Sequence, residues 1–262
     1  MNKLKDNALV YESRKISDAA ELYELVLECP DIAGKALPGQ IVHVACGEGT
    51  TLRRPISVCE TIDGEKIRLC YEVRGKGTKW MSERKTGERI SLLGPLGHGF
   101  TYHDGKRALL VGGGIGIYPL LSIGKKYGKD AKALFGFRNI SLINSTELFE
   151  SHDIPVSVIT DDGSNGRKGF VTELVREELE KNRTDIIYVC GPRGMMAAVA
   201  RIAAEYGVEC EVSMEERMGC GVGACLACVC KTMFVENNEA AEKYKRVCVD
   251  GPVFDAKEII WK

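Results

Sequence analysis

Four cysteines near the carboxyl end of the chain have the types and spacing suited to binding iron. Cys220, Cys225 and Cys228 follow the pattern C-x4-C-x2-C, and Cys248 lies further along the chain. Four cysteine thiolates arranged in this way are a ligand set for a 2Fe-2S cluster. Glycines around the first cysteines let the backbone curve tightly and turn its N–H groups toward sulfur. We therefore predict a one-electron redox centre in this loop.

Zinc, or no metal at all, are the alternatives for these cysteines. Zinc sites usually take their ligands as two short Cys-x2–4-Cys pairs, whereas here three cysteines share one loop. Buried cysteines also serve as small apolar packing residues, although these do not usually gather in a glycine-rich loop. Cys230 follows Cys228 closely and is expected to be a bystander, with an exchange of ligands left open.

The composition describes an ordinary globular protein and limits the classes of function. The 262 residues carry a net charge of −1, which gives no electrostatic reason to bind nucleic acid or an anionic membrane. No apolar run approaches the ~18 residues of a membrane span, and the first residues lack the apolar core of a signal peptide. Eleven cysteines without an export signal indicate reduced thiols and metal ligands, so we expect a cytoplasmic protein.

Residues 1–103 have the pattern of a β domain. Short apolar runs are separated by turn signals such as Pro38-Gly39, and these runs lie at 41–44, 56–58 and 67–73. Closely spaced short strands of this kind predict an antiparallel barrel or sandwich. The segment 93–100 is rich in glycine and proline, so we expect no strand there.

Residues 104–212 alternate between strand and helix patterns. Continuous apolar runs predict strands buried on both faces, at 107–111, 133–137, 156–160 and 186–190. Helices are expected between them, at 118–127, 170–181 and 194–206. This alternation predicts a Rossmann-like α/β domain with a parallel sheet. Residues 213–262 then form a third, small domain that carries the cysteines.

Two turns in the α/β region follow predicted strands and open predicted helices. The first contains Gly112, Gly113, Gly114 and Gly116, and the second contains Cys190, Gly191 and Pro192. Such turns allow a pyrophosphate to approach the backbone N–H groups at a helix start, and ligands bind at the carboxyl ends of parallel strands. The turn at 161–164 is a further candidate for a ribose contact, although such turns are often only solvated. A dinucleotide site is therefore expected between the two glycine turns.

Two motifs in the β region carry a family resemblance. Arg54-Pro55-Ile56-Ser57 lies in a predicted strand, and Gly75-Lys76-Gly77-Thr78 forms a later turn. Together they resemble the flavin site of the ferredoxin–NADP reductase superfamily. The resemblance implies an FAD-binding barrel at 1–103, an NAD-binding domain at 104–212 and a 2Fe-2S domain at 213–262. It also implies FAD contacts from Arg54, Pro55, Ile56, Ser57, Cys70, Tyr71, Glu72, Gly77 and Thr78.

Within that superfamily the chain is most similar to the electron-transfer subunits of NAD-dependent, type B dihydroorotate dehydrogenase. The similarity rests on Arg54–Ser57, Gly75–Thr78, Leu93–Gly97 and Gly112–Gly116, and it is strengthened by the more specific Arg217–Cys225 and Val247–Phe254 segments. It implies cluster ligation by Cys220, Cys225, Cys228 and Cys248. It also implies a separate FMN-containing catalytic subunit, in a heterotetramer of two copies of each chain, that acts in pyrimidine biosynthesis.

Flavin chemistry connects the three domains into an electron path. A nicotinamide exchanges a hydride and a 2Fe-2S cluster exchanges single electrons, while a flavin can do both. Ser57 is expected near the flavin N5 and Cys190 beside the nicotinamide. Arg138 leaves the choice between NAD and NADP open on sequence grounds. The remaining alternatives are the flavin subunit of an NADH-dependent ferredoxin:NADP+ oxidoreductase or sulfide dehydrogenase, and a non-catalytic zinc-binding interaction module.

Overall fold

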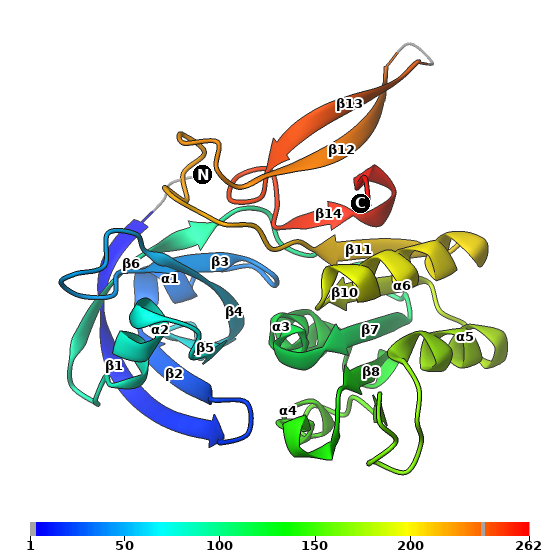
Figure 1. The fold of residues 1–262 in the computed structure, drawn as a ribbon, viewed down its shortest axis with the longest axis horizontal. Coiled ribbons are helices and arrows are strands. Elements are labelled where there is room, and N and C mark those ends of the chain that lie inside the picture. Colours follow the sequence, from blue (N-terminus) through cyan, green and yellow to red (C-terminus); the bar gives the residue numbers. More distant parts are fainter. Residues whose placement is uncertain (1–3, 237–238, 262) are drawn as a thin grey trace.

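A closed barrel, an α/β sheet and a cysteine-bearing segment make up the computed structural model, which describes residues 4–236 and 239–261 (Figure 1). The barrel and the sheet lie side by side, and the cysteine-bearing segment lies across one end of both (Figure 1). Within the described residues no helix is long and apolar enough to cross a membrane.

The barrel is built from strands of the first part of the chain. Its strands are β1 (Leu4–Ser17), β2 (Leu22–Glu28), β3 (Ile41–Val44), β4 (Arg54–Ile62), β5 (Lys66–Glu72) and β6 (Arg89–Leu96). They close in the order β1-β2-β5-β4-β3-β6, and neighbouring strands are antiparallel. Two short helices, α1 (Pro30–Ala33) and α2 (Lys76–Ser82), complete this part. Val42 and Val44 of β3 point into the barrel core, so His43 between them faces outward.

Strand β6 continues through Leu93-Gly94-Pro95-Leu96, where the sequence predicted no strand. His43 pairs with Leu93 and Ile41 pairs with Leu96, and a register shift between these two pairs accommodates the extra residues. Proline cannot donate to a ladder of hydrogen bonds, so a sheet accepts it at bulges and strand ends. The prediction was therefore wrong for 93–96, because composition alone does not reveal a bulge.

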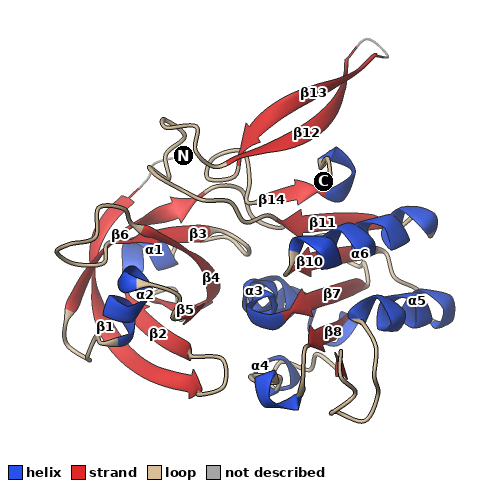
Figure 2. Ribbon diagram, in the orientation of Figure 1, coloured by secondary structure: helices blue, strands red, loops and turns tan. Residues whose placement is uncertain are grey.

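The α/β region holds a six-stranded sheet with helices against it (Figure 2). The parallel strands are β7 (Ala108–Gly113), β8 (Ala131–Phe137), β9 (Val156–Thr160), β10 (Ile186–Cys190) and β11 (Glu209–Ser213). The helices are α3 (Tyr118–Tyr127), α4 (Glu147–Glu150), α5 (Val171–Lys181) and α6 (Arg193–Glu205). The predicted strands and long helices are confirmed, with bounds that differ by at most two residues.

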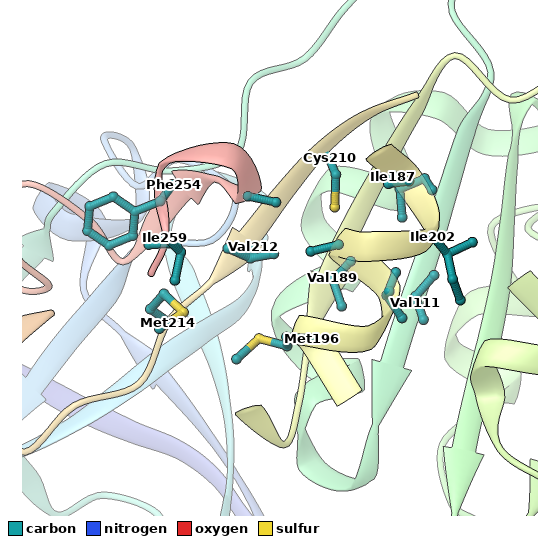
Figure 3. Close-up of a cluster of buried hydrophobic side chains, with 14 of the residues drawn as sticks. Val111, Ile187, Val189, Met196, Ile202, Cys210, Val212, Met214, Phe254 and Ile259 are labelled. Atoms are coloured by element: carbon teal, nitrogen blue, oxygen red, sulfur yellow. The ribbon is translucent and has the colours of Figure 1, made fainter. Parts of the chain in front are cut away.

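The carboxyl-terminal segment is joined to this sheet. Strands β12 (Val229–Glu236) and β13 (Glu239–Arg246) form a hairpin, and β14 (Val253–Asp255) pairs antiparallel with β11 at the sheet edge. Phe254 and Ile259 lie against Val212 and Met214 in the same hydrophobic core as helix α6 (Figure 3). Cys228 and Cys248 belong to that core as well. The cysteine segment and the α/β sheet are therefore stabilised by one shared core.

Candidate redox site

The four predicted iron ligands come together as two pairs. The backbone N–H of Cys220 donates to Sγ of Cys225 at 3.4 Å, and the N–H of Cys225 donates to Sγ of Cys220 at 3.4 Å. The thiols of Cys228 and Cys248 lie within hydrogen-bonding reach of each other. Among the residues that the structure describes, no three His, Cys, Asp or Glu side chains are arranged to hold a metal ion. A 2Fe-2S cluster divides its cysteines between two irons, so an arrangement in two pairs fits that group.

Backbone N–H groups surround the sulfur of Cys220. Val222 and Ala224 donate to it at 3.4 and 3.3 Å, in addition to Cys225. Gly221 and Gly223 have φ angles of 69° and 82°, which allow this tight curve. Burial alone would raise the pKa of the Cys220 thiol, but the N–H donors outweigh it and lower the pKa to about 6. The loop is therefore suited to holding thiolates, the form in which cysteine binds metal.

The fourth cysteine is placed by the turn that follows β13. The guanidinium of Arg246 donates from Nη1 to the carbonyl of Gly223 at 3.3 Å and pairs with Asp250 at 3.0 Å. The N–H of Val247 donates to the carbonyl of Cys228 at 2.8 Å. These contacts tie the turn to the cysteine loop, so Cys248 reaches Cys228 although it is distant in sequence.

Cys230 lies apart from this arrangement. Its side chain is buried in the core shared with the α/β sheet. Burial and the nearby carboxylate of Glu216 raise the pKa of its thiol to about 11. A neutral, buried thiol fits the expected role of a bystander.

The motifs expected at the flavin meet at one corner of the barrel. The Arg54 guanidinium lies over Gly77, where an added Cβ would stand 2.4 Å from its Nε. Thr78 Oγ1 accepts from the N–H groups of Arg74 and Gly75 at 2.9 and 3.2 Å and so fixes the turn. A fixed positive charge beside a tight turn fits the pyrophosphate of a dinucleotide.

The remaining expected flavin residues divide between two faces of their strands. In β4, Ile56 packs against the barrel core, whereas Pro55 and Ser57 face outward. In β5, Tyr71 is buried in the barrel core, and its hydroxyl group has no hydrogen-bond partner in the part of the chain that the structure describes. Cys70 is buried against α3 in the core between barrel and sheet. Glu72 lines the large cleft between barrel and sheet.

That cleft has a volume of about 940 Å³ and brings the two predicted glycine turns together. Gly113, Gly114 and Gly116 line it from the end of β7, and Gly191 and Pro192 line it from the end of β10. The turns are in direct contact, since a Cβ on Gly116 would stand 2.3 Å from the carbonyl oxygen of Cys190. Their position at the carboxyl ends of parallel strands fits a nicotinamide dinucleotide.

Gly112 and Cys190 lie behind the cleft surface. Gly112 packs against Ile117 and Phe135. The Cys190 thiol is buried beside Ser213, and burial raises its pKa to about 12. Cys190 therefore stays neutral and shapes the floor of the site without acting as a thiolate.

The sequence analysis missed several residues that line the cleft. Glu215 follows β11, and burial raises the pKa of its carboxyl group while the charge of Arg74 opposes that shift. Phe170 remains 64% exposed at the cleft edge, on the same side as Arg138 and Asp161. Prediction of β11 as a parallel strand would have indicated Glu215, because ligands gather at the carboxyl ends of such strands.

His43 was also missed, and it lies where the barrel meets the cysteine loop. Its side chain is fully buried, and a Cβ on Gly221 would stand 2.7 Å from its Nδ1. Within residues 4–236 and 239–261, neither ring nitrogen has a hydrogen-bond partner. Burial, assisted by the charge of Arg53, lowers the pKa of His43 to about 4.

Comparison with known families supports this arrangement. The family described as the iron-sulfur cluster binding domain of dihydroorotate dehydrogenase B matches residues 215–260. The family described as the oxidoreductase NAD-binding domain matches residues 110–201. These ranges contain the four cysteines and the two glycine turns.

Relatives cover nearly the whole chain. The electron transfer subunit of dihydroorotate dehydrogenase B (NAD+) from Caldanaerobacter subterraneus is 42% identical over 260 residues, or 98% of this chain and 99% of that protein. The subunit of the same name from Bacillus mycoides is 40% identical over 266 residues, or 98% of each.

Solved structures show the same fold. A structure of an NADH-dependent reduced ferredoxin-NADP oxidoreductase superposes with a TM-score of 0.84 at 31% identity, and covers 98% of this chain and 90% of that one. The ferredoxin reductase of carbazole 1,9a-dioxygenase has a TM-score of 0.67 at 22% identity, over 79% and 67% of the two chains, which supports the fold alone. With its barrel, dinucleotide cleft and paired cysteines, the chain belongs to the family of electron transfer subunits of NAD+-linked dihydroorotate dehydrogenase B.

Proposed function

We propose that this chain accepts electrons from a separate FMN-containing dihydroorotate dehydrogenase subunit and delivers them to NAD+, in pyrimidine biosynthesis. When bound, the 2Fe-2S cluster supplies one-electron exchange and FAD supplies both one-electron and hydride exchange. The observation that carries the proposal is that the cysteine loop, the flavin corner and the dinucleotide cleft meet around one end of the barrel. His43 contacts the loop, and Glu72 and Arg74 line the cleft.

The chain's own residues hold and orient these groups. Arg54 and the turn at Gly77 and Thr78 would hold the FAD pyrophosphate, and Ser57 would lie beside the flavin ring. Gly113, Gly116 and Gly191 let the nicotinamide dinucleotide approach the backbone. Neither Ser57 nor Cys190 needs to transfer a proton. The Cys190 thiol stays neutral, because burial raises its pKa to about 12.

The partner would dock over the exposed side of the cysteine loop. Leu226 is 61% exposed and Tyr244 is 59% exposed, and both line a shallow pocket beside the loop. Val222 and Cys225 also reach the surface there. Exposed apolar side chains of this kind mark protein interfaces. We assign this surface to the catalytic subunit, in a heterotetramer of two copies of each chain, and place the complex in the cytoplasm.

Co-expression with the candidate catalytic subunit tests the proposal. The purified complex is expected to reduce NAD+ with dihydroorotate. Leu226→Glu would bury a charge at the interface, so we expect it to weaken the affinity between the subunits at least tenfold, or about 1.4 kcal/mol of binding free energy. Ile140→Glu is the matched control, because Ile140 is similarly exposed at 54% but lies outside this pocket. A complex that reduces NAD+ from another donor and not from dihydroorotate would contradict the proposal.

A further inference from the structure

His43 joins the barrel to the cysteine loop through a close contact. It lies on β3 and pairs with Pro55 of β4, the strand expected to hold the flavin. Its ring edge, formed by Nδ1 and Cε1, lies so close to Gly221 that a Cβ there would stand 2.7 Å from both atoms. Only glycine therefore leaves room for the imidazole next to Cys220.

The imidazole has a hydrogen-bonding requirement that the surrounding protein atoms do not meet. Both ring nitrogens are buried, and neither has a hydrogen-bond partner among the described residues. A neutral imidazole carries one N–H donor and one acceptor, and leaving a buried donor unpaired costs ~1–3 kcal/mol. Arg53 donates to the backbone carbonyl of His43 at 3.2 Å and leaves the ring available to another partner.

The position of His43 indicates what that partner is. The Nδ1 edge faces the stretch that begins at Cys220, whose sulfur already accepts three backbone N–H groups. On the barrel, His43 shares the outward face of β3 and β4 with Pro55 and Ser57. The ring therefore lies between the strand expected to hold the flavin and the loop of the predicted iron ligands, and the sulfurs of a bound cluster would supply acceptors on the loop side.

We propose that His43 donates a ring N–H to a sulfur of the 2Fe-2S cluster and so raises the reduction potential of the cluster. A donor stabilises the extra negative charge of the reduced cluster, and hydrogen bonds to sulfur are among the factors that set such potentials. His43 is thus a positioning residue that sets the one-electron equilibrium between flavin and cluster. The proposal rests on the electron-transfer function proposed above, but it does not depend on which donor reduces the cluster.

Potentiometric titration of the purified holoprotein tests this role, with the cluster followed by EPR and the flavin by its visible absorption. His43→Leu removes the donor and keeps an apolar side chain of similar bulk. We expect its cluster to be about tenfold harder to reduce relative to FAD, which equals ~59 mV for a one-electron couple. His43→Asn places an amide N–H near the position of Nδ1 and is expected to restore most of the shift.

Ser91→Ala is the matched control. Ser91 accepts from Arg53 at 2.9 Å in the same region of the barrel but presents no group to the loop, so its cluster potential should equal that of the wild type. An unchanged potential in His43→Leu, an equal shift in His43→Leu and Ser91→Ala, or a shift confined to the flavin would overturn the proposal.

A spectroscopic measurement on the wild-type protein covers the case in which His43→Leu fails to fold. The chain has four histidines, so labelling them with ¹⁵N is selective. Pulsed EPR of the reduced cluster is expected to detect a ¹⁵N coupling that is lost in His43→Asn. Absence of any histidine coupling in the wild type would also refute the assignment, whatever the activity of the complex.

Discussion

The ammonium group of Lys125 on α3 donates to Oε2 of Glu60 on β4 at 2.5 Å, so one ion pair joins the α/β sheet to the barrel. The Glu60 side chain is only 7% exposed, and its other oxygen accepts from Arg68 at 2.8 Å. Arg68 in turn pairs with the buried carboxylate of Glu24. The dinucleotide cleft depends on this junction, because the barrel and the sheet each supply part of its lining.

Lys125→Met should therefore loosen the junction. Removing Lys125 leaves the buried carboxylate of Glu60 with less compensation, and we expect a loss of ~1–3 kcal/mol in the free energy of unfolding. Thermal denaturation of the holoprotein measures it. Lys129→Met, at an exposed position one turn away, should change stability by less than ~0.5 kcal/mol. Equal melting temperatures for the two variants would show that the pair contributes little.

Cys220→Ser should abolish the iron–sulfur spectrum, whereas Cys230→Ser should retain it. The Cys220 sulfur is surrounded by N–H donors, while Cys230 is packed in the shared core. Iron content and the EPR signal of the reduced protein distinguish the two. A loss of iron in Cys230→Ser at normal melting temperature would mean that Cys230 is a ligand after all.

Gly116→Ala should impair the nicotinamide site selectively. An added methyl group would meet the carbonyl oxygen of Cys190 at 2.3 Å and push the two glycine turns apart. We expect the KM for NAD+ to rise at least tenfold, with FAD content unchanged. Gly194→Ala is the control, because Gly194 also lines the cleft but has no atom within 4 Å of an added Cβ. Similar KM values for both variants would contradict this view of the cleft.

Acid should destabilise the cluster-free wild-type chain more than cluster-free His43→Leu. The pKa of His43 is lowered to about 4 in the folded protein, against ~6.5 when unfolded, so unfolding takes up a proton between these values. Above pH ~6.5 this proton uptake by His43 does not affect stability. As the pH decreases from there toward 4, it lowers the free energy of unfolding by at most ~1.4 kcal/mol per pH unit. Melting temperatures between pH 7 and pH 5 measure the difference. Parallel curves for the two proteins would argue against the lowered pKa.

The sequence predicts the α/β region well because its strands are buried on both faces and its helices have clear periodicity. The strand Ile186–Cys190 and the helix Tyr118–Tyr127 have the expected bounds. The strand through Gly94 and Pro95 was missed, since a bulge depends on the partner strand rather than on local composition. The assignment of Cys220 and Cys248 as iron ligands comes from their spacing and from the family similarity, and it stays a prediction. The placement of His43 against Gly221 could not be predicted, because it depends on how two distant segments pack.

The pairing of β14 with β11 determines how the redox groups are held relative to one another. In many electron carriers a tethered domain swings between a donor and an acceptor, so transfer waits for diffusion of that domain. Here the segment after the cysteine loop is an edge strand of the dinucleotide-binding sheet, and Phe254 and Ile259 are buried in the core of that sheet. Swinging would require this strand to detach and the core to open. Electrons therefore cross this chain between redox sites that the fold holds at a fixed distance from each other.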